Sequence, residues 1–507
     1  MTKKIIQILL LLLTPIMARA QRMDVENAPI EMAQHMSSLY NYLIQLTDST
    51  DYLYKHIPNR IQASFTNDNS SGQFVHYLGK RHTFGQLLAQ GQLHIKESGT
   101  LYGQASYQSG RRTQTSYSYS AYPEEMRPYL VSDTLGATTM DIETYHVLGG
   151  YSFNLGKYAL GTEVDYEGIA LSRSNDPRLA NYAHHIRMGL ACSRVYAHDI
   201  LAIKFSPEWI RESISANSIM DGVKYFQFYG FGLWNRRETQ GAITYGRQQT
   251  QLSIGTDAAW FHKGTWNWAL HAFWKYSAMN CEEANFKELF TSRTHHFQQQ
   301  LLLSRQFTNS SLHFQFSAQE HLRKGSEAVY QQQIQDAQGG LYDYVKVGSN
   351  DLYANNWQSA DIKMKYIQNL TPTSSLDVFA GFTYNHFEEK YKSPIMKIEN
   401  QTTSALLGVG YQSIQKSLQW KISVYASTQG GTKNTYSIPG NADKTQLTMA
   451  YIPYLLRGEN HQTAGASVQI SVPVKAHQSV GFYFAQDYLN SDYRQQMVMT
   501  TGLFYLF

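Results

Sequence analysis

The sequence predicts an all-β fold, a transmembrane antiparallel up-and-down β-barrel of about eighteen strands, with a range of sixteen to twenty. Three observations predict it. Polar and apolar residues alternate along most of the 507-residue chain, short and long connections follow one another, and the chain stops inside an apolar strand pattern. A free apolar strand edge invites aggregation, whereas a closed barrel pairs both edges of its last strand.

Residues 1–20 have the pattern of a secretory signal peptide. Lys3 and Lys4 precede a short apolar run, Ile5–Leu13, and Ala18-Arg19-Ala20 supplies a cleavage pattern of small residues. We therefore expect an exported chain whose mature form begins near Gln21. No Cys follows the apolar run, so the pattern does not indicate a lipid anchor.

Residues 21–58 are expected to form an N-terminal periplasmic lead-in or a small plug in the lumen. Two stretches within it, Glu31–Met36 and Leu39–Ile44, have a mixed pattern that suggests short helical or irregular pieces. The segment is several times shorter than the globular domain of plugged, energy-coupled receptors. Its length therefore disfavours that class.

The barrel is expected over residues 59–507. In Trp266–Tyr276, for example, the even positions are apolar, whereas Asn267, His271 and Lys275 occupy the opposite face. A soluble sandwich also alternates in this way. However, Trp and Tyr concentrate near the strand ends, as in an interfacial aromatic girdle, and the connections alternate in length, which favours a membrane barrel. The ~20-residue apolar run of a transmembrane helix does not occur.

The connections predict which rim each strand end faces. Short joints are expected at 96–99, 154–156, 196–198, 262–264, 308–310, 371–373, 415–417 and 473–477, and long loops near 111–140, 169–183, 207–247, 277–294, 322–356, 388–400, 429–460 and 488–494. The first strand is expected within Asn59–Leu78, and the last strand should pair with it and with Gln478–Gln486. Lys224–Trp234 and Gln240–Tyr245 fit no membrane strand and are expected to form a hairpin in an outer loop.

The closing run Leu503-Phe504-Tyr505-Leu506-Phe507, with the signal peptide and the serial strands, resembles a Gram-negative outer-membrane β-barrel. Such proteins commonly end in Phe with an aromatic residue two positions earlier, as Phe507 and Tyr505 do here. The resemblance implies location in the outer membrane, contact with its lipid and lipopolysaccharide, long outer loops, short periplasmic turns, and recognition of Leu503, Tyr505 and Phe507 by the assembly machinery. The overall pattern is similar to uncharacterised outer-membrane barrel families of Bacteroidota.

Barrel geometry turns the polar face of each strand into a lumen lining. The residues expected to line the lumen are Glu163, Asp165, Glu167, Arg187, Lys204, His271, Lys275, His313, Lys363, Lys365, Asp377 and Lys421, and His94, His146 and Asp257 share this face. These groups either cross-link the wall or form a polar path whose opposed charges set a transverse field. The acidic row Glu163, Asp165 and Glu167 is the best candidate for a selectivity element.

Neither a metal nor a cofactor is expected. The neighbouring histidines His184-His185 and His295-His296 cannot bind one ion together, since adjacent strand residues point to opposite faces. The 322–356 segment contains four acidic or amide residues without the spacing of a calcium loop: Asp336, Asp343, Asn350 and Asp351. Binding of a cation that stabilises this loop is left as an alternative.

Cys192 and Cys281 are expected to be unpaired, the first in a strand and the second in a polar loop. The net charge of +4 is spread along the chain and gives no basic patch for nucleic acid. Gly-x-Ser-x-Gly and phosphate-binding loops are absent, so an enzyme is not expected.

The leading functional prediction is a channel or transporter for small solutes with a polar lumen and without a large plug. The alternative is a surface-exposed binding or scaffold barrel whose loops at 322–356 and 429–460 engage a lipoprotein, a glycan or a neighbouring barrel. An outer-membrane enzyme is the third hypothesis. The sequence does not specify the transported solute.

Overall fold

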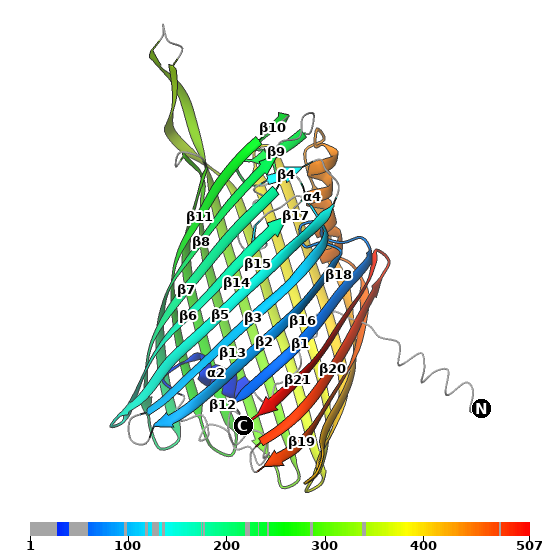
Figure 1. The fold of residues 1–507 in the computed structure, drawn as a ribbon. Coiled ribbons are helices and arrows are strands. Elements are labelled where there is room, and N and C mark those ends of the chain that lie inside the picture. Colours follow the sequence, from blue (N-terminus) through cyan, green and yellow to red (C-terminus); the bar gives the residue numbers. More distant parts are fainter. Residues whose placement is uncertain are drawn as a thin grey trace, which may run out of the picture.

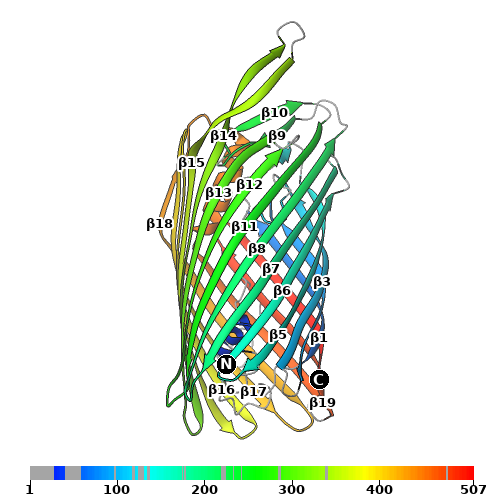
Figure 2. The ribbon, with the colours of Figure 1, turned by 90° about the vertical axis from the view of Figure 1, so that its left-hand side faces the viewer.

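The computed structural model describes residues 28–39, 59–95, 99–116, 120–123, 131–133, 137–173, 175, 178–218, 224–231, 233–240, 243–283, 287–336, 341–475 and 478–507. The signal-peptide prediction for residues 1–20 lies outside these residues, as does most of the lead-in. Within them, eighteen antiparallel strands form one closed barrel, as predicted (Figures 1 and 2).

The barrel strands follow one another around the wall in chain order, so the topology is up-and-down. They are β1 (Arg60–Gly72), β2 (Arg81–Ile95), β3 (Gly99–Thr115), β5 (Thr138–Leu155), β6 (Tyr158–Arg173), β7 (Arg178–Val195), β8 (Asp199–Ser218), β11 (Ile243–His262), β12 (Asn267–Glu283), β13 (Lys287–Gln306), β14 (Ser310–Asp336), β15 (Leu341–Thr371), β16 (Ser374–Lys392), β17 (Ile395–Ile414), β18 (Gln419–Ser437), β19 (His461–Lys475), β20 (Gln478–Ser491) and β21 (Arg494–Leu506).

The final strand closes the barrel as predicted. β21 pairs with β20 on one edge and with β1 on the other, where Arg60 faces Leu506 and Gly72 faces Arg494. The backbone N–H of Phe507 also donates to the carbonyl oxygen of Asn59, at 3.0 Å. The chain therefore ends at the rim that carries the short turns (Figure 1).

Short connections occur at this rim where they were expected, as between β5 and β6 and between β15 and β16. The opposite rim differs from the prediction, because much of the expected loop sequence is strand. β12 and β13 cover most of 277–294, and β14 and β15 cover most of 322–356. The ladder of β14 and β15 continues beyond the wall as a projecting hairpin (Figure 1). Because this part of the two strands lies in water, it can be polar, as a loop is, and still form strands.

The outer surface of the wall is apolar. Large hydrophobic side chains are exposed at alternate positions along successive strands, including Leu87, Leu93, Val147, Val164, Leu190, Ile203, Leu252, Leu270, Ile362, Leu407 and Leu503. A surface of this kind suits the hydrocarbon region of an outer membrane. Their strand neighbours face the barrel interior.

Among the described residues, no helix is long and apolar enough to cross a membrane.

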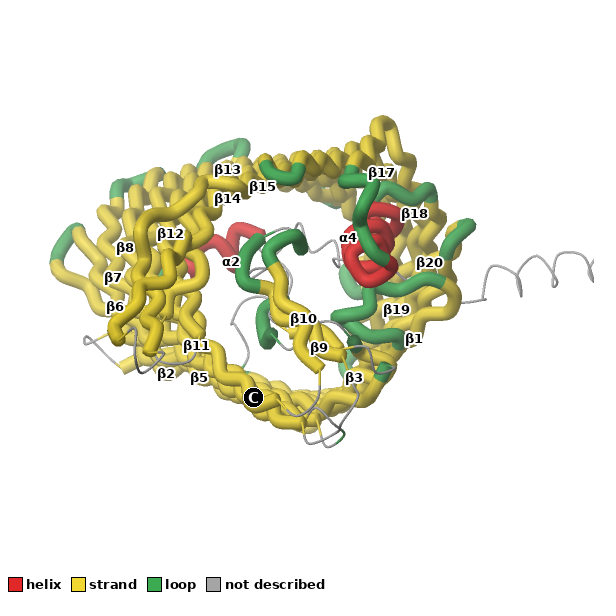
Figure 3. Tube along the Cα trace, turned by 90° about the horizontal axis from the view of Figure 1, so that it is seen from above, coloured by secondary structure: helices red, strands yellow, loops and turns green. Residues whose placement is uncertain are grey.

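Several elements lie inside the barrel outline (Figure 3). Helix α2 (Ala28–His35) sits toward the short-turn rim, as Figure 2 also shows. At the opposite end lie helix α4 (Lys444–Arg457) and a three-stranded sheet of β4 (Val131–Asp133), β9 (Lys224–Phe228) and β10 (Arg236–Gln240). A hairpin is present within 207–247, as predicted, and it folds inward (Figure 3). Its second strand is Arg236–Gln240, and the predicted second strand, Gln240–Tyr245, was wrong because residues 243–245 begin the wall strand β11 and pair with β8.

Candidate functional site in the barrel interior

Inward-folded connections lie in the mouth of the barrel at the rim opposite the short turns (Figure 3). We call β4, β9, β10, α4 and residues 120–123, 229–231 and 233–235 the mouth plug. Tyr225, Phe228 and Phe231 of this plug have no solvent exposure. An aromatic-rich connection gains more by burial against the wall than by exposure to water, which explains why it folds inward.

Phe231 lies at the centre of the apolar contact between plug and wall. Its ring stacks on that of Tyr353 from β15, with centroids 4.7 Å apart, and meets the edge of Phe290 from β13 at 4.9 Å. The same buried cluster contains Cys281, which was expected in a polar loop. That expectation was wrong because Cys281 lies within the wall strand β12, between β11 and β13, and packs in the cluster that includes plug residues.

A buried carboxylate holds the turn between β9 and β10. Glu327 of β14 is 3 % exposed, and its Oε1 accepts hydrogen bonds from the backbone N–H of Phe231 at 2.7 Å and from the Tyr391 hydroxyl at 2.8 Å. Its Oε2 accepts a third from the Asn235 amide at 3.0 Å. The carboxylate thus satisfies donors of both the plug and the wall.

A second buried carboxylate, Glu212 of β8, anchors the segment at 120–123. Its oxygens accept hydrogen bonds from the Ser120 hydroxyl, at 3.0 Å, and from the backbone N–H of Ala121, at 2.5 Å. The wall amides of Asn181 and Gln249 donate to the same carboxylate at 2.7 and 3.0 Å. Plug and wall are therefore joined here as well.

Helix α4 is joined to β10 and to the connection between β9 and β10. Asp443 and Gln446 form a capping box at its start, which satisfies the first free backbone N–H groups. The Arg236 guanidinium pairs with Asp443, and the Gln446 amide donates to the carbonyl oxygen of Leu233 at 2.8 Å. Burial opposes ionisation of Asp443, but Arg236 and the backbone N–H of Gln446 outweigh it, so the pKa of Asp443 lies below its usual value.

Helix α2 contacts the wall near the other end of the lumen. Met32, Met36 and Leu39 pack in a small apolar cluster with wall residues such as Ile200 and Phe261. Ser152 of β5 donates to the carbonyl oxygen of Ser38 at 2.9 Å. A Cβ at Gly161 of β6 would lie 2.4 Å from the Ser38 nitrogen, so the close approach requires glycine.

Lys204 connects the end of α2 to two wall strands. Its ammonium donates to the carbonyl oxygen of His35 at 2.6 Å and to the Glu163 carboxylate at 2.5 Å. Both side chains are almost fully buried, at 1 % and 3 % exposure. The pair balances its own charge and fixes the position of the helix end.

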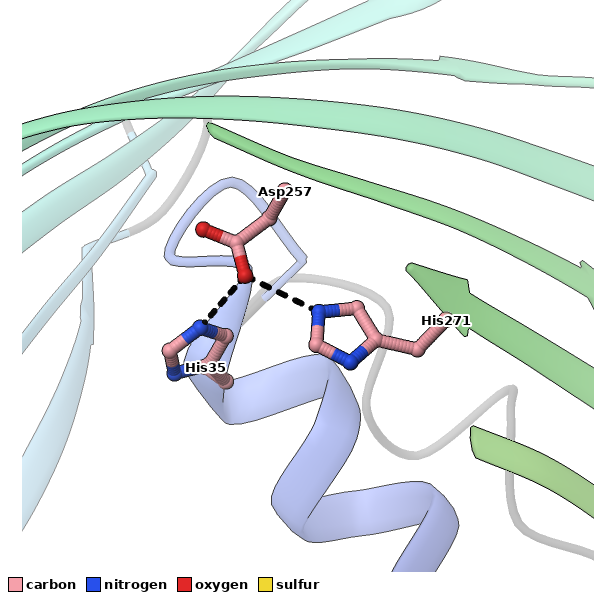
Figure 4. A group of neighbouring side chains, drawn as sticks. All are labelled: His35, Asp257 and His271. Atoms are coloured by element: carbon pink, nitrogen blue, oxygen red, sulfur yellow. Dashed lines mark hydrogen bonds and ion pairs between the residues drawn. The ribbon is translucent and has the colours of Figure 1, made fainter. Parts of the chain in front are cut away.

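Beside it, two imidazoles converge on one carboxylate (Figure 4). The Nε2 atoms of His35, from α2, and of His271, from β12, each lie 2.9 Å from Oδ1 of Asp257 on β11. Among the described residues this is the cluster in which three side chains of metal-binding type bring their ligand atoms within 4.8 Å of one another.

Charged side chains of both signs line the wall of neighbouring strands. Asp165 pairs with His146 and with Arg187, each at 2.6 Å. Glu208 pairs with Lys275 at 3.3 Å and lies 3.6 Å from His185. Most of these groups therefore have a partner of opposite charge within the wall.

The remaining predicted lumen residues are distributed around the barrel. Lys365 and Asp377 form a buried pair at 3.0 Å, and Glu167 accepts from the Tyr122 hydroxyl of the plug at 3.1 Å. His313 borders a cavity of about 320 Å³ near the short-turn rim. Lys363 and Lys421 lie on β15 and β18, at positions that alternate with the exposed Ile362 and Ile422. The His94 ring is hydrogen-bonded to the Thr100 hydroxyl at 3.0 Å.

The three carboxylates of the acidic row have different partners. Glu163 is neutralised by Lys204, Asp165 by Arg187, and Glu167 contacts the plug, so the three carboxylates have different environments. The sequence alone did not identify four interior residues, namely His35, Glu208, Glu212 and Glu327. The density of aromatic residues in Tyr225–Phe231 was the available signal that this connection is buried.

The adjacent histidines diverge as predicted. His184 contacts the Tyr166 hydroxyl at 2.9 Å, whereas His185 faces Glu208. His295 stacks with Trp274, whereas the His296 ring meets that of His321 at 5.8 Å. Neither pair can bind one ion through both rings. Cys192 and Cys281 are both free, which confirms the prediction.

Residues 50–505 match a family of unknown function, DUF6850. A comparison with curated proteins found no match.

Several solved structures are similar at low identity. The copper transporter OprC has 9 % identity and a TM-score of 0.44, over 86 % of this chain and 63 % of that protein, so this chain spans less than two thirds of its length. The outer-membrane transporter YddB from Escherichia coli has 8 % identity and a TM-score of 0.41, over 89 % and 81 % of the two chains. The ferric enterobactin receptor from Pseudomonas aeruginosa, solved with enterobactin, has 10 % identity and a TM-score of 0.38, over 88 % and 81 %.

Proposed function

We propose that this chain, which belongs to the family of unknown function DUF6850, is a gated outer-membrane transport barrel for small polar solutes. The observation that carries the proposal is the mouth plug. It lies inside one end of a barrel whose wall carries many charged and hydrogen-bonding side chains on its inner face (Figure 3).

The size of the barrel supports transport. Eighteen strands enclose a lumen that is wide enough for an aqueous channel unless protein fills it. Here the filling at the mouth comes from connections between strands, not from the wall. Removing these connections from the lumen leaves every ladder hydrogen bond of the wall in place.

The contacts of the plug suit a gate. Polar attachments of the described plug residues to the wall lie at defined points, among them Glu212, Glu327 and Arg247. The Arg236–Asp443 pair joins two elements within the plug. A solute or partner that replaces these contacts would release the plug. The paired charges below it, such as Asp165 with Arg187, would then offer hydrogen bonds to a polar solute without a strong preference for one sign of charge.

Solute entry into liposomes tests the proposal. Purified full-length chain and a variant in which residues 224–240 are replaced by a short Gly-Ser linker would be reconstituted, and swelling would be followed in small sugars and amino acids. We expect slow swelling with the intact chain and fast swelling with the variant. A folded variant that admits no solute would contradict a transport function.

A second candidate function rests on the hairpin of β14 and β15, which projects beyond the mouth (Figure 1). Ile334, Tyr344 and Val347 are exposed on it, at 63 %, 50 % and 54 %. We propose that it engages a surface lipoprotein or a neighbouring barrel. The other loop expected to bind a partner, 429–460, instead contributes α4 to the mouth plug.

Photo-cross-linking in intact cells tests this second function. A photoreactive residue at position 334 or 347 is expected to form an adduct with one protein, whereas the same residue at position 382, on the outer face of the wall, is not. Adducts with lipid alone at all three positions would contradict it.

A further inference from the structure

We propose that His35, Asp257 and His271 form a binding site for one divalent transition-metal ion, which clamps α2 to the barrel wall. The three side chains come from three elements, α2, β11 and β12, that are joined here (Figure 4). The proposal is independent of the mouth plug and of transport.

The distances fit such a site. Both Nε2 atoms lie 2.9 Å from Oδ1 of Asp257, and all three ligand atoms lie within 4.8 Å of one another. Bonds of about 2.0–2.2 Å place the ligand atoms of a tetrahedral ion roughly 3.3 Å apart. Small rotations of the two rings therefore suffice to admit an ion.

The type of ligand selects the class of metal. Two imidazole nitrogens and one carboxylate oxygen suit zinc, nickel, copper or ferrous iron. Calcium and magnesium prefer oxygen ligands throughout and are disfavoured. His35 is 37 % exposed, so a fourth coordination position is accessible from the lumen to water or to another ligand.

A second observation at Asp257 also points to a ligand. Its side chain is only 1 % exposed, and its Oδ2 atom is buried without a hydrogen-bond partner. A buried carboxylate oxygen without a partner is costly. A metal ion beside Asp257 would compensate that cost in one of two ways. It could bind both carboxylate oxygens, or it could bind Oδ1 and concentrate the negative charge of the carboxylate on that oxygen, which leaves less charge on Oδ2.

Lys204, which lies opposite Asp257 in the pairing of β8 with β11, does not prevent binding. The Lys204 ammonium is already engaged by the Glu163 carboxylate and by the carbonyl oxygen of His35, so its charge is balanced. These contacts also hold the end of α2 in place and thereby position His35. His35 is the last residue of the helix, where the helix dipole favours a cation.

Titration of the untagged, full-length protein with zinc chloride tests the site, with cobalt chloride as a spectroscopic probe. We expect one ion per folded chain and a cobalt absorption spectrum typical of nitrogen and oxygen ligands. His35→Ala and His271→Ala should each weaken binding at least about tenfold, since even changes outside a ligand set cost that much. Asp257→Asn, which preserves shape, should do the same.

His321→Ala is the matched control, because His321 is a partly buried interior histidine outside the cluster and should leave the titration unchanged. Folding of each variant is checked by heat-modifiable electrophoretic migration. Absence of zinc binding by the folded parent chain would overturn the proposal. Unchanged affinity in His35→Ala would overturn it too, since the clamp requires a ligand from α2.

The clamp has its own readout. Zinc should slow amide hydrogen exchange in residues 28–38 of the parent chain and of His321→Ala, but not in His271→Ala, where the change is in the wall. Exchange in α2 that does not respond to zinc, with the ion nevertheless bound, would contradict the clamp.

Discussion

The mouth plug and helix α2 occupy opposite ends of the same lumen and are held in different ways. The plug buries a continuous aromatic and aliphatic cluster against the wall and satisfies two buried carboxylates, Glu212 and Glu327. Helix α2 has eight residues and forms a small apolar patch together with residues 36–39 after it, and the attachments of residues 28–39 are mostly ionic or polar, at Lys204, Asp257 and Ser152. Displacing the mouth plug should therefore require a large free-energy input, whereas a small free-energy change should be enough to displace α2.

The largest effect is expected for Phe231→Ala in the plug. Removing a fully buried aromatic side chain typically costs about 3–5 kcal/mol. The substitution should destabilise the packing of the plug but not the wall, because the wall keeps its interstrand hydrogen bonds. Channel openings should therefore appear in planar bilayers. Phe382→Ala, on the outer face of β16, should remain closed. Unfolding of the whole barrel by Phe231→Ala would show that plug and wall are one cooperative unit.

A smaller effect is expected for Glu327. Glu327→Ala leaves three donors without an acceptor, and such a loss costs about 1–3 kcal/mol. Glu327→Gln retains an oxygen for Phe231 and Tyr391 and loses only the bond from Asn235. The open probability in bilayers should therefore rank Ala above Gln above the parent chain, and equal values for the two variants would contradict this anchor.

At the other end, Gly161→Ala should displace α2. The added Cβ would lie 2.4 Å from the Ser38 nitrogen and 2.6 Å from the Ser37 carbonyl carbon, both backbone atoms. Overpacking of this kind costs about 1–3 kcal/mol, and amide exchange in residues 28–38 should accelerate about 5- to 100-fold. Gly149→Ala, where a Cβ meets nothing within 4 Å, should leave exchange unchanged.

The smallest effect is expected from the Arg236–Asp443 pair. Because the pKa of Asp443 is lowered, the pair stabilises the plug fully above the ordinary value of 3.8 and is lost as the pH falls through the lowered pKa. Asp443 is 39 % exposed, so the contribution should stay below about 1 kcal/mol. Open probability should be slightly higher in Asp443→Asn at pH 6, and the two proteins should converge at low pH. A constant difference across this range would exclude the ion pair as its source.

The wall could be predicted from the sequence, because lipid on one side and the lumen on the other impose alternation on every strand. The strand count, the closing pairs of β21 and the divergence of His184 and His185 all follow from that period of two. The interior could not be predicted in the same way. Phe231 and Glu327 are 96 positions apart, and His35 and Asp257 are 222 apart, so no local pattern brings them together. Cys281 was misplaced for the same reason.

Single-channel recording tests most directly whether the mouth plug, and not the wall, closes the lumen. The intact chain and the chain lacking residues 224–240 would be recorded in planar bilayers under the same conditions, after heat-modifiable migration has shown that both are folded. We expect no conductance from the intact chain and discrete conductance steps from the chain that lacks residues 224–240. Equal silence, or equal conductance, in the two proteins would contradict it.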